Sequence, residues 1–140
     1  MGTRSTIALE FADGTVEQVY CHWDGYLSHN GKILQESYSD PFKLQRLLDL
    51  GGISSLDKEI GIQHNFNDRL EGVTTFYTRD RGESLTIEKF ASFADYVENH
   101  QYEEFEYILR QVDGKAVWFV SEGGKYITLA EAFEKEKEAA

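Results

Sequence analysis

The sequence predicts an α+β domain, in which an antiparallel sheet of about five strands carries helices packed on it. Two turn signals, Asp13-Gly14 and Asp113-Gly114, each join a pair of β-rich segments, as in β-hairpins. Amphipathic and capped segments between and after these hairpins predict helices. The chain has 140 residues, of which 41% are hydrophobic and 14% aromatic. This length and composition suit a single domain over residues 1–140.

The first hairpin pairs residues 4–11 with residues 16–23. Alternation along the second strand places two sets of side chains on opposite faces. One set is Val16, Gln18, Tyr20 and His22, and the other is Glu17, Val19, Cys21 and Trp23. Because neither face is wholly polar, we expect this hairpin to be central in the sheet and covered on both sides.

Two helices follow, over residues 31–38 and from residue 41 onward. Asp40 is suited to cap the second helix and Pro41 to occupy its first position. Gly51-Gly52 is expected to end it. Residues 53–72 are irregular and polar, and such a segment in a small domain is often functional or mobile.

The rest of the chain predicts a mixture of strands and helices. Residues 73–79 are expected to form a third strand, in the same sheet as the first hairpin. The spacing of apolar residues predicts a helix over residues 86–100. A second hairpin follows over residues 105–112 and 116–121, with a brief extension at 126–127 and an acidic helix over residues 129–138.

Charge and cysteine content limit the classes of function. The chain holds 14 basic and 25 acidic residues, a net charge of −11. Duplex-binding proteins normally carry a basic patch, so direct nucleic-acid binding is not expected, whereas basic partners are. Cys21 is the only cysteine, which excludes an intrachain disulfide and fits a reducing cytoplasm. No apolar run approaches the ~20 residues of a membrane span, so no membrane partner is expected.

Candidate binding residues gather in two turns, each after an expected strand. They are His22, Trp23, Asp24, Tyr26, Arg79, Asp80, Arg81 and Glu83. Arginines alternating on one strand face could hold a phosphate or carboxylate, and His22 with Asp24 or Asp80 could relay a proton. An ion-paired network that stabilises the turns explains the same residues. We expect a charged contact between one of the arginines and Asp24, Asp80 or Glu83.

Other candidate chemistry is weaker. No metal or cofactor is expected, because His22, Asp24 and His29 do not follow a recognised ligand spacing. Cys21 and His22 point to opposite faces of a strand, which favours a buried structural thiol. Two or three aromatic residues should line a pocket, and Trp23 and Tyr26 are expected first and at least partly exposed. The full set of candidates is Tyr20, Trp23, Tyr26, Tyr38, Phe76, Tyr77, Trp118 and Phe119.

Several blocks of the chain occur together in a known group of proteins. They are Thr3-Arg-Ser-Thr-Ile-Ala8, Tyr20-Cys-His-Trp-Asp-Gly-Tyr-Leu-Ser-His-Asn-Gly31 with Ile33-Leu34, Gly52-Ile-Ser-Ser-Leu56 and Thr75-Phe-Tyr-Thr-Arg-Asp-Arg-Gly-Glu83. The chain thereby resembles a family of small proteins carried by bacteriophages, prophages and some bacteria. The resemblance covers most of residues 3–60. It implies a phage or prophage accessory gene and supplies no mechanism.

Three functional interpretations follow. The leading one is a phage-type accessory binding protein in the host cytoplasm, which acts on a host component in host takeover or counter-defence. Its partner would be a host protein or a small anionic ligand. The alternatives are a small enzyme acting on a phosphorylated or nucleotide-like substrate, and an acidic mimic of nucleic acid that uses runs such as residues 131–138. Assembly into a homo-oligomer stays open.

Overall fold

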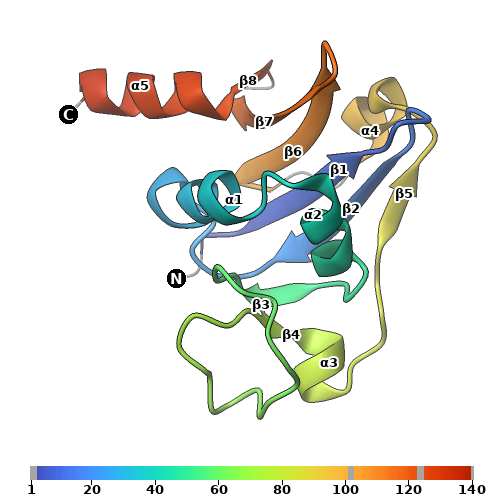
Figure 1. Cartoon of the computed structure of the whole chain (residues 1–140), viewed down its shortest axis with the longest axis vertical. Helices are drawn as coiled ribbons and strands as arrows, with labels where there is room; N and C mark the ends of the chain where they lie inside the picture. The colour runs from blue at the N-terminus through green and yellow to red at the C-terminus, as the bar shows by residue number, and fades with distance from the viewer. Residues whose placement is uncertain (1–2, 101–102, 123–124, 140) are drawn as a thin grey trace.

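The structure is a computed structural model that describes residues 3–100, 103–122 and 125–139. Within these residues an eight-stranded sheet forms the body, surrounded by five α-helices and one π-helical turn (Figure 1). The strands are β1 (Ser5–Glu10), β2 (Val16–Cys21), β3 (Ile53–Ser55), β4 (Thr75–Phe76), β5 (Glu88–Phe90), β6 (Phe105–Val112), β7 (Lys115–Glu122) and β8 (Lys125–Thr128). The helices are η1 (Leu27–Gly31), α1 (Lys32–Ser37), α2 (Pro41–Leu48), α3 (Tyr77–Arg81), α4 (Phe93–Asn99) and α5 (Leu129–Ala139).

The sheet is mixed and larger than the sequence predicted. Its order is β4-β3-β2-β1-β6-β7-β8, and β5 also pairs with β2. Most pairs are antiparallel, but β1 runs parallel to β6 and β2 runs parallel to β3. The α+β class is therefore right, whereas the smaller, wholly antiparallel sheet is wrong. Strands of two or three residues, such as β3, β4 and β5, carry too little periodic pattern to be recognised.

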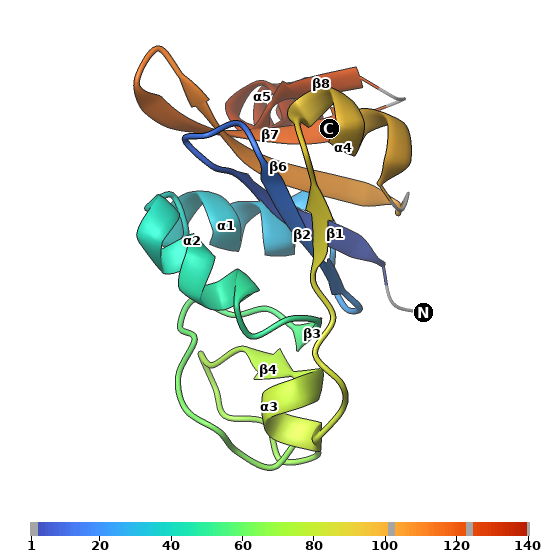
Figure 2. The same ribbon diagram turned by 90° about the vertical axis from the view of Figure 1, so that its right-hand side faces the viewer.

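The outer edge of β2 has two different partners. Along its first half, Val16 to Gln18 pair with β5, and at its end Cys21 pairs with Ile53 of β3. Figure 2 shows β5 alongside β2, with the chain reaching it from α3. We call the stretch around Val19 and Tyr20, where the two partners diverge, the fork of β2.

Hydrophobic residues cover both faces of the central strands. On one face the main core packs Ile7 and Val19 against residues of α1 and α2, such as Leu34 and Leu44. On the other face a smaller core packs Ala8, Val16 and Ile108 against Tyr96 of α4. Figure 2 shows α1 and α2 on one side of the sheet and α4 on the other. The first hairpin is thus central and covered on both sides, as predicted.

Local signals placed several elements correctly. The Asp40 carboxylate accepts a hydrogen bond from Phe42 N at 3.0 Å, and Pro41 begins α2. Gly51 follows α2 with a φ of +80°, which favours glycine. Asp113 and Gly114 have φ values of +52° and +80°, as a two-residue hairpin turn between β6 and β7 requires. These positions confirm the capped helix and the second hairpin.

Two segments differ from the prediction. Residues 86–100 form β5 and then α4, because pairing with β2 holds residues 88–90 extended and Ser92 caps the following helix. Of residues 73–79, only Thr75–Phe76 form a strand, and it belongs to the same sheet as β2. The chain then turns into α3, whose start is fixed by a hydrogen bond of 2.8 Å from Phe76 N to the Asp80 carboxylate.

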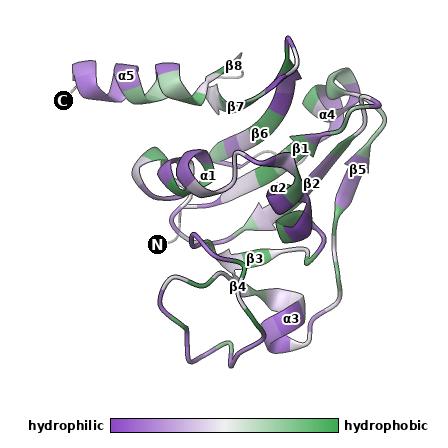
Figure 3. Ribbon diagram, in the orientation of Figure 1, coloured by the Kyte–Doolittle hydropathy of each residue, from purple (hydrophilic) through white to green (hydrophobic). Residues whose placement is uncertain are grey.

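The C-terminal helix matches the expected acidic segment. Only its first part packs on the body, where Leu129 and Ala132 are buried. Figure 3 colours much of its outer half as hydrophilic, in keeping with the exposed side chains of residues 134–138. Among the helices described, none combines the length and apolar content needed to cross a bilayer.

Gly25 closes the turn after β2 against the first strand. Its N–H donates to Thr3 O at 2.7 Å, and its carbonyl accepts a hydrogen bond of 2.6 Å from the Tyr107 hydroxyl. A Cβ at this position would lie 2.8 Å from both Ser5 Cβ and Thr3 O. The turn therefore has no room for a side chain.

We predict that Gly25→Ala lowers the free energy of unfolding by about 2 kcal/mol, because an added methyl group forces a backbone shift in a packed region. Urea unfolding followed by circular dichroism measures this. Gly52→Ala is the matched control, since its Cβ would come no closer than 3.5 Å to another atom. Equal effects of the two substitutions would contradict the prediction.

Candidate functional site

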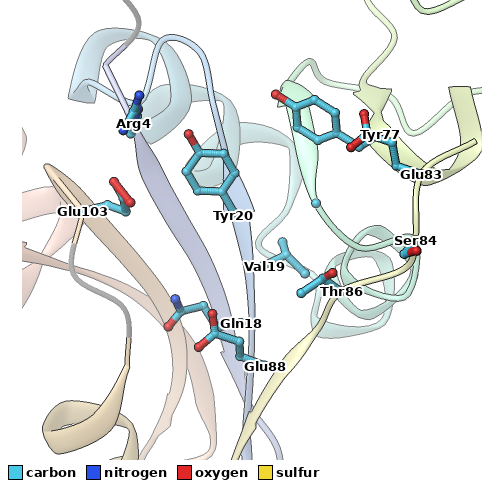
Figure 4. A pocket seen from close by; sticks show the side chains of 11 residues that line it. Arg4, Gln18, Val19, Tyr20, Tyr77, Glu83, Ser84, Thr86, Glu88 and Glu103 are labelled. Carbon is cyan, nitrogen blue, oxygen red and sulfur yellow. The ribbon is translucent and has the colours of Figure 1, made fainter. Parts of the chain in front are cut away.

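A pocket of about 460 Å³ opens at the fork of β2 (Figure 4). Its size falls in the range of roughly 300–1,000 Å³ that is typical of ligand sites. Eleven residues from five parts of the chain line it: Arg4, Gln18, Val19, Tyr20, Gly52, Tyr77, Glu83, Ser84, Thr86, Glu88 and Glu103. We call it the fork pocket. It exists because β5 and β3 leave a gap between them along the edge of β2.

Gln18 is the most unusual residue of the fork pocket. Its side chain lies beside Glu88, its partner in the β2–β5 pairing (Figure 4). Gln18 is only 2% exposed, yet its Oε1 accepts no hydrogen bond from any described residue. An unmatched buried carbonyl oxygen destabilises a protein by about 1–3 kcal/mol. Such a group in a pocket is a candidate for contact with a ligand.

The charge of the fork pocket is negative. One arginine, Arg4, faces three glutamates, Glu83, Glu88 and Glu103, which gives these lining side chains a net charge of −2. Glu83 also pairs with Arg81 at 3.2 Å, but both side chains are about half exposed. Water weakens an ion pair of this kind. The pocket therefore presents mainly carboxylate oxygens.

Two tyrosines border the fork pocket from different elements. Tyr20 comes from β2 and Tyr77 from the start of α3, and both rings are visible in Figure 4. The Tyr20 hydroxyl forms a hydrogen bond of 2.7 Å with Nδ1 of His22. Partial burial raises the pKa of Tyr20, although the charge of Arg4 acts in the opposite direction. Tyr20 is therefore a neutral phenol at pH 7.

The predicted residues of the first turn lie beside the fork pocket and do not line it. Trp23 is 36% exposed and Tyr26 is 40% exposed, which confirms that both are partly accessible. The ring of His22 meets that of Trp23 edge-on, with 4.7 Å between centroids. Asp24 has a φ of +56°, a left-handed conformation that aspartate tolerates in turns. Among the described residues, Tyr20 and Tyr77, rather than Trp23 and Tyr26, are the aromatic residues of the pocket.

Buried polar contacts explain why the first turn holds so many polar groups. The fully buried Asn30 donates from Nδ2 to Ser5 Oγ at 3.2 Å, Cys21 Sγ at 3.3 Å and Trp23 O at 3.4 Å. Burial raises the pKa of Cys21 to about 11, so the thiol stays protonated. Cys21 is thus the buried structural thiol that the sequence predicted.

The second predicted cluster forms a clamp on the preceding 57–74 segment. All three guanidinium nitrogens of Arg79 donate hydrogen bonds: Nε to Asp80 at 3.0 Å, Nη1 to Ile60 O at 2.8 Å, and Nη2 to Thr74 O at 2.9 Å. The buried Asp80 carboxylate also accepts from His64 N at 3.0 Å. The expected charged contacts are confirmed for Arg79 with Asp80 and for Arg81 with Glu83.

The clamp and the first turn remain separate. In the part of the chain that the structure describes, no hydrogen bond or ion pair joins His22 or Asp24 to residues 79–83. Arg79 and Arg81 lie on a helix and not on a strand face. Of the eight residues predicted from sequence, only Glu83 lines the fork pocket.

Sequence reasoning missed most residues of the fork pocket. Glu88 and Thr86 fell in a segment predicted to be helical, and Arg4 lay at the start of a strand. Gln18 carried the one available signal, because it is an amide between Val16 and Tyr20 on a strand face predicted to be covered. Within the described residues, no group of three or more His, Cys, Asp or Glu side chains is arranged to hold a metal ion.

Comparisons of the chain with protein-family models, curated proteins and solved structures found no match. The geometry of the fork pocket is therefore the basis for assigning a function.

We predict that Arg79→Gln destabilises the protein by about 3 kcal/mol, because it leaves the buried Asp80 carboxylate without its cation. Arg81→Gln is the matched control and should change stability by less than about 0.5 kcal/mol, since its pair is solvent-exposed. Side-chain exposure is 12% for Arg79 and 57% for Arg81. Chemical denaturation of both variants measures the difference. Near-native stability of Arg79→Gln would favour an anion site at the clamp instead.

A second prediction concerns the pH dependence of the clamp. Desolvation opposes ionisation of Asp80, but hydrogen bonds from Arg79, Phe76 and His64 outweigh it and lower the pKa of Asp80. The resulting stabilisation is complete above the unfolded-state pKa of about 3.9 and is lost as pH falls through the lower folded-state pKa. Asp80→Asn should therefore be less stable than wild type at pH 7, and the gap should narrow below about pH 4. Urea unfolding across pH tests this, with the exposed Asp68→Asn as control. A gap independent of pH would contradict it.

Proposed function

We propose that the protein is a phage-type binding protein that acts on a host component in the bacterial cytoplasm and holds one group of that component in the fork pocket. The observation that carries the proposal is a pocket of ligand size whose lining includes Gln18, a buried side chain with an unmatched Oε1. The resemblance to phage and prophage proteins supports the setting, host takeover or counter-defence.

The fork pocket is a better candidate than the arginine clamp. Every guanidinium nitrogen of Arg79 already donates to a carboxylate or a carbonyl of the chain. Arg81 is engaged with Glu83 and lies over the ring of Phe66, 5.0 Å from its centroid. A small anion would have to displace these contacts. We therefore favour a host protein over a small anionic ligand as the partner.

Binding is also better supported than catalysis. The Cys21 thiol is sealed in the core and remains protonated. The Tyr20 phenol, which does reach the pocket, has a raised pKa and is a poor base at neutral pH. Neither group is activated as a nucleophile, and holding a ligand requires no such activation.

We predict that Thr86→Trp blocks the fork pocket, because Thr86 is an exposed residue of its rim and indole would fill the opening. The measurement is amide chemical shifts of the ¹⁵N-labelled full chain titrated separately with methylguanidinium, spermidine, inorganic phosphate and adenosine monophosphate. At least one probe should shift the amides of Val19, Tyr20 and Glu88 saturably in wild type and not in Thr86→Trp.

Gln111→Trp is the control, because Gln111 is exposed on β6 and does not line the pocket. It should bind the same probe as wild type does. The proposal fails if no probe of either charge shifts the pocket amides, or if Thr86→Trp binds as well as wild type.

A further inference from the structure

We propose that the fork pocket recognises an organic cation with several N–H donors, a guanidinium or alkylammonium group. Such a group is found on arginine and lysine side chains of proteins and on free polyamines. This inference rests on the proposed function and names its ligand class. It replaces the small anion expected from the sequence by a ligand of opposite charge.

The fork pocket carries a surplus of negative charge. Among the described lining residues, Glu83, Glu88 and Glu103 face one cation, Arg4, and the chain as a whole carries −11. Charges within a Debye length of about 8–10 Å act together at ordinary ionic strength. An anion in the pocket would be repelled by this surplus of carboxylates, whereas a cation would be attracted by it.

The fork pocket also contains hydrogen-bond acceptors. Gln18 and Glu88 are cross-strand partners whose side chains lie next to each other in the fork pocket (Figure 4). Glu88 offers carboxylate oxygens, and the buried Gln18 beside it carries an amide oxygen that has no donor among the described residues. A ligand reaches this buried oxygen only if the terminal amide rotates, and the amide oxygen and nitrogen that would exchange places have nearly the same shape. A guanidinium carries five N–H donors and an ammonium three, so either matches this set of acceptors.

The aromatic rings of the fork pocket also favour a cation. Tyr20 and Tyr77 border the pocket from β2 and α3. Tyrosine faces attract guanidinium and ammonium groups through the cation–π interaction. Acidic oxygens combined with tyrosine rings are a recurring means of holding such cations, and they do not favour phosphate. A metal ion is a weaker candidate, since the described residues form no metal-binding group of three.

The test compares two ligands of nearly the same shape. L-argininamide and L-citrullinamide differ chiefly in that a guanidinium is replaced by a neutral urea. Calorimetry and amide shifts of the full chain should show saturable binding of argininamide at Val19, Tyr20 and Glu88. Citrullinamide should bind at least about tenfold more weakly, the loss expected for charge-assisted hydrogen bonds. Inorganic phosphate should not shift these amides.

Protein variants complete the test. Glu88→Gln should weaken argininamide binding by about tenfold, whereas Glu138→Gln, which changes the net charge equally on the exposed part of α5, should leave it unchanged. Gln18→Met keeps the side-chain length and removes the acceptor. It should lose affinity while keeping or raising the melting temperature. Should Gln18→Met fail to fold, the Glu88 and Glu138 variants still decide the outcome.

The outcomes separate this inference from the proposed function. Equal binding of citrullinamide, or tighter binding of phosphate at the same amides, would contradict the preference for a cation. It would still support the fork pocket as the binding site. Absence of any binding at these amides would overturn both. Among cations, tighter binding of spermidine than of an arginine-containing peptide assigns a polyamine ligand, and the reverse order assigns a basic side chain of a partner protein.

Discussion

The divided outer edge of β2 is the constraint on which the rest of the structure depends. β5 pairs only as far as Gln18, and β3 begins pairing at Cys21. Neither partner covers the intervening residues, so the sheet opens there into the fork pocket. The pocket wall opposite β2 is formed by segments that β3 and β5 connect to the sheet. The Arg79–Asp80 clamp holds the 57–74 segment to α3, and α3 in turn places Tyr77 and Glu83 at the pocket.

Elements with strong local signals were predictable from sequence. The Asp40-Pro41 helix start and the Asp113-Gly114 turn fix backbone conformation within a few residues, and the structure has both. The fork was not predictable in the same way. β4 and β5 are extended only because they pair with distant strands, and residues 86–100 have the apolar spacing of a helix. Tertiary pairing outweighs such local preferences, which are worth little per residue. The parallel pairing of β1 with β6 joins strands separated by most of the chain and has no local signature.

The segment Cys21–Tyr26, which is dense in polar and aromatic residues, lies beside the fork pocket and does not line it. Its cysteine, its glycine and the following Asn30 tie the end of β2 to the first strand through buried contacts. Tyr20 and Gln18, on the other face of the same strand, reach the pocket. A polar cluster at a strand end can therefore arise from the need to satisfy buried groups in a tight turn. The informative signal was a single glutamine on a covered strand face.

Gln18 links the stability of the fold to its proposed activity. A leucine or methionine at this position would bury the same surface without leaving an acceptor unmatched, so the amide lowers the stability of the ligand-free protein. Proteins retain such locally unfavourable groups mainly at functional sites. β2 is also an interior strand that is packed on both faces, which favours side chains that are held in place before a ligand arrives. A rigid acceptor set loses little conformational entropy on binding, and this favours selectivity for a cation of matching shape over affinity for any cation.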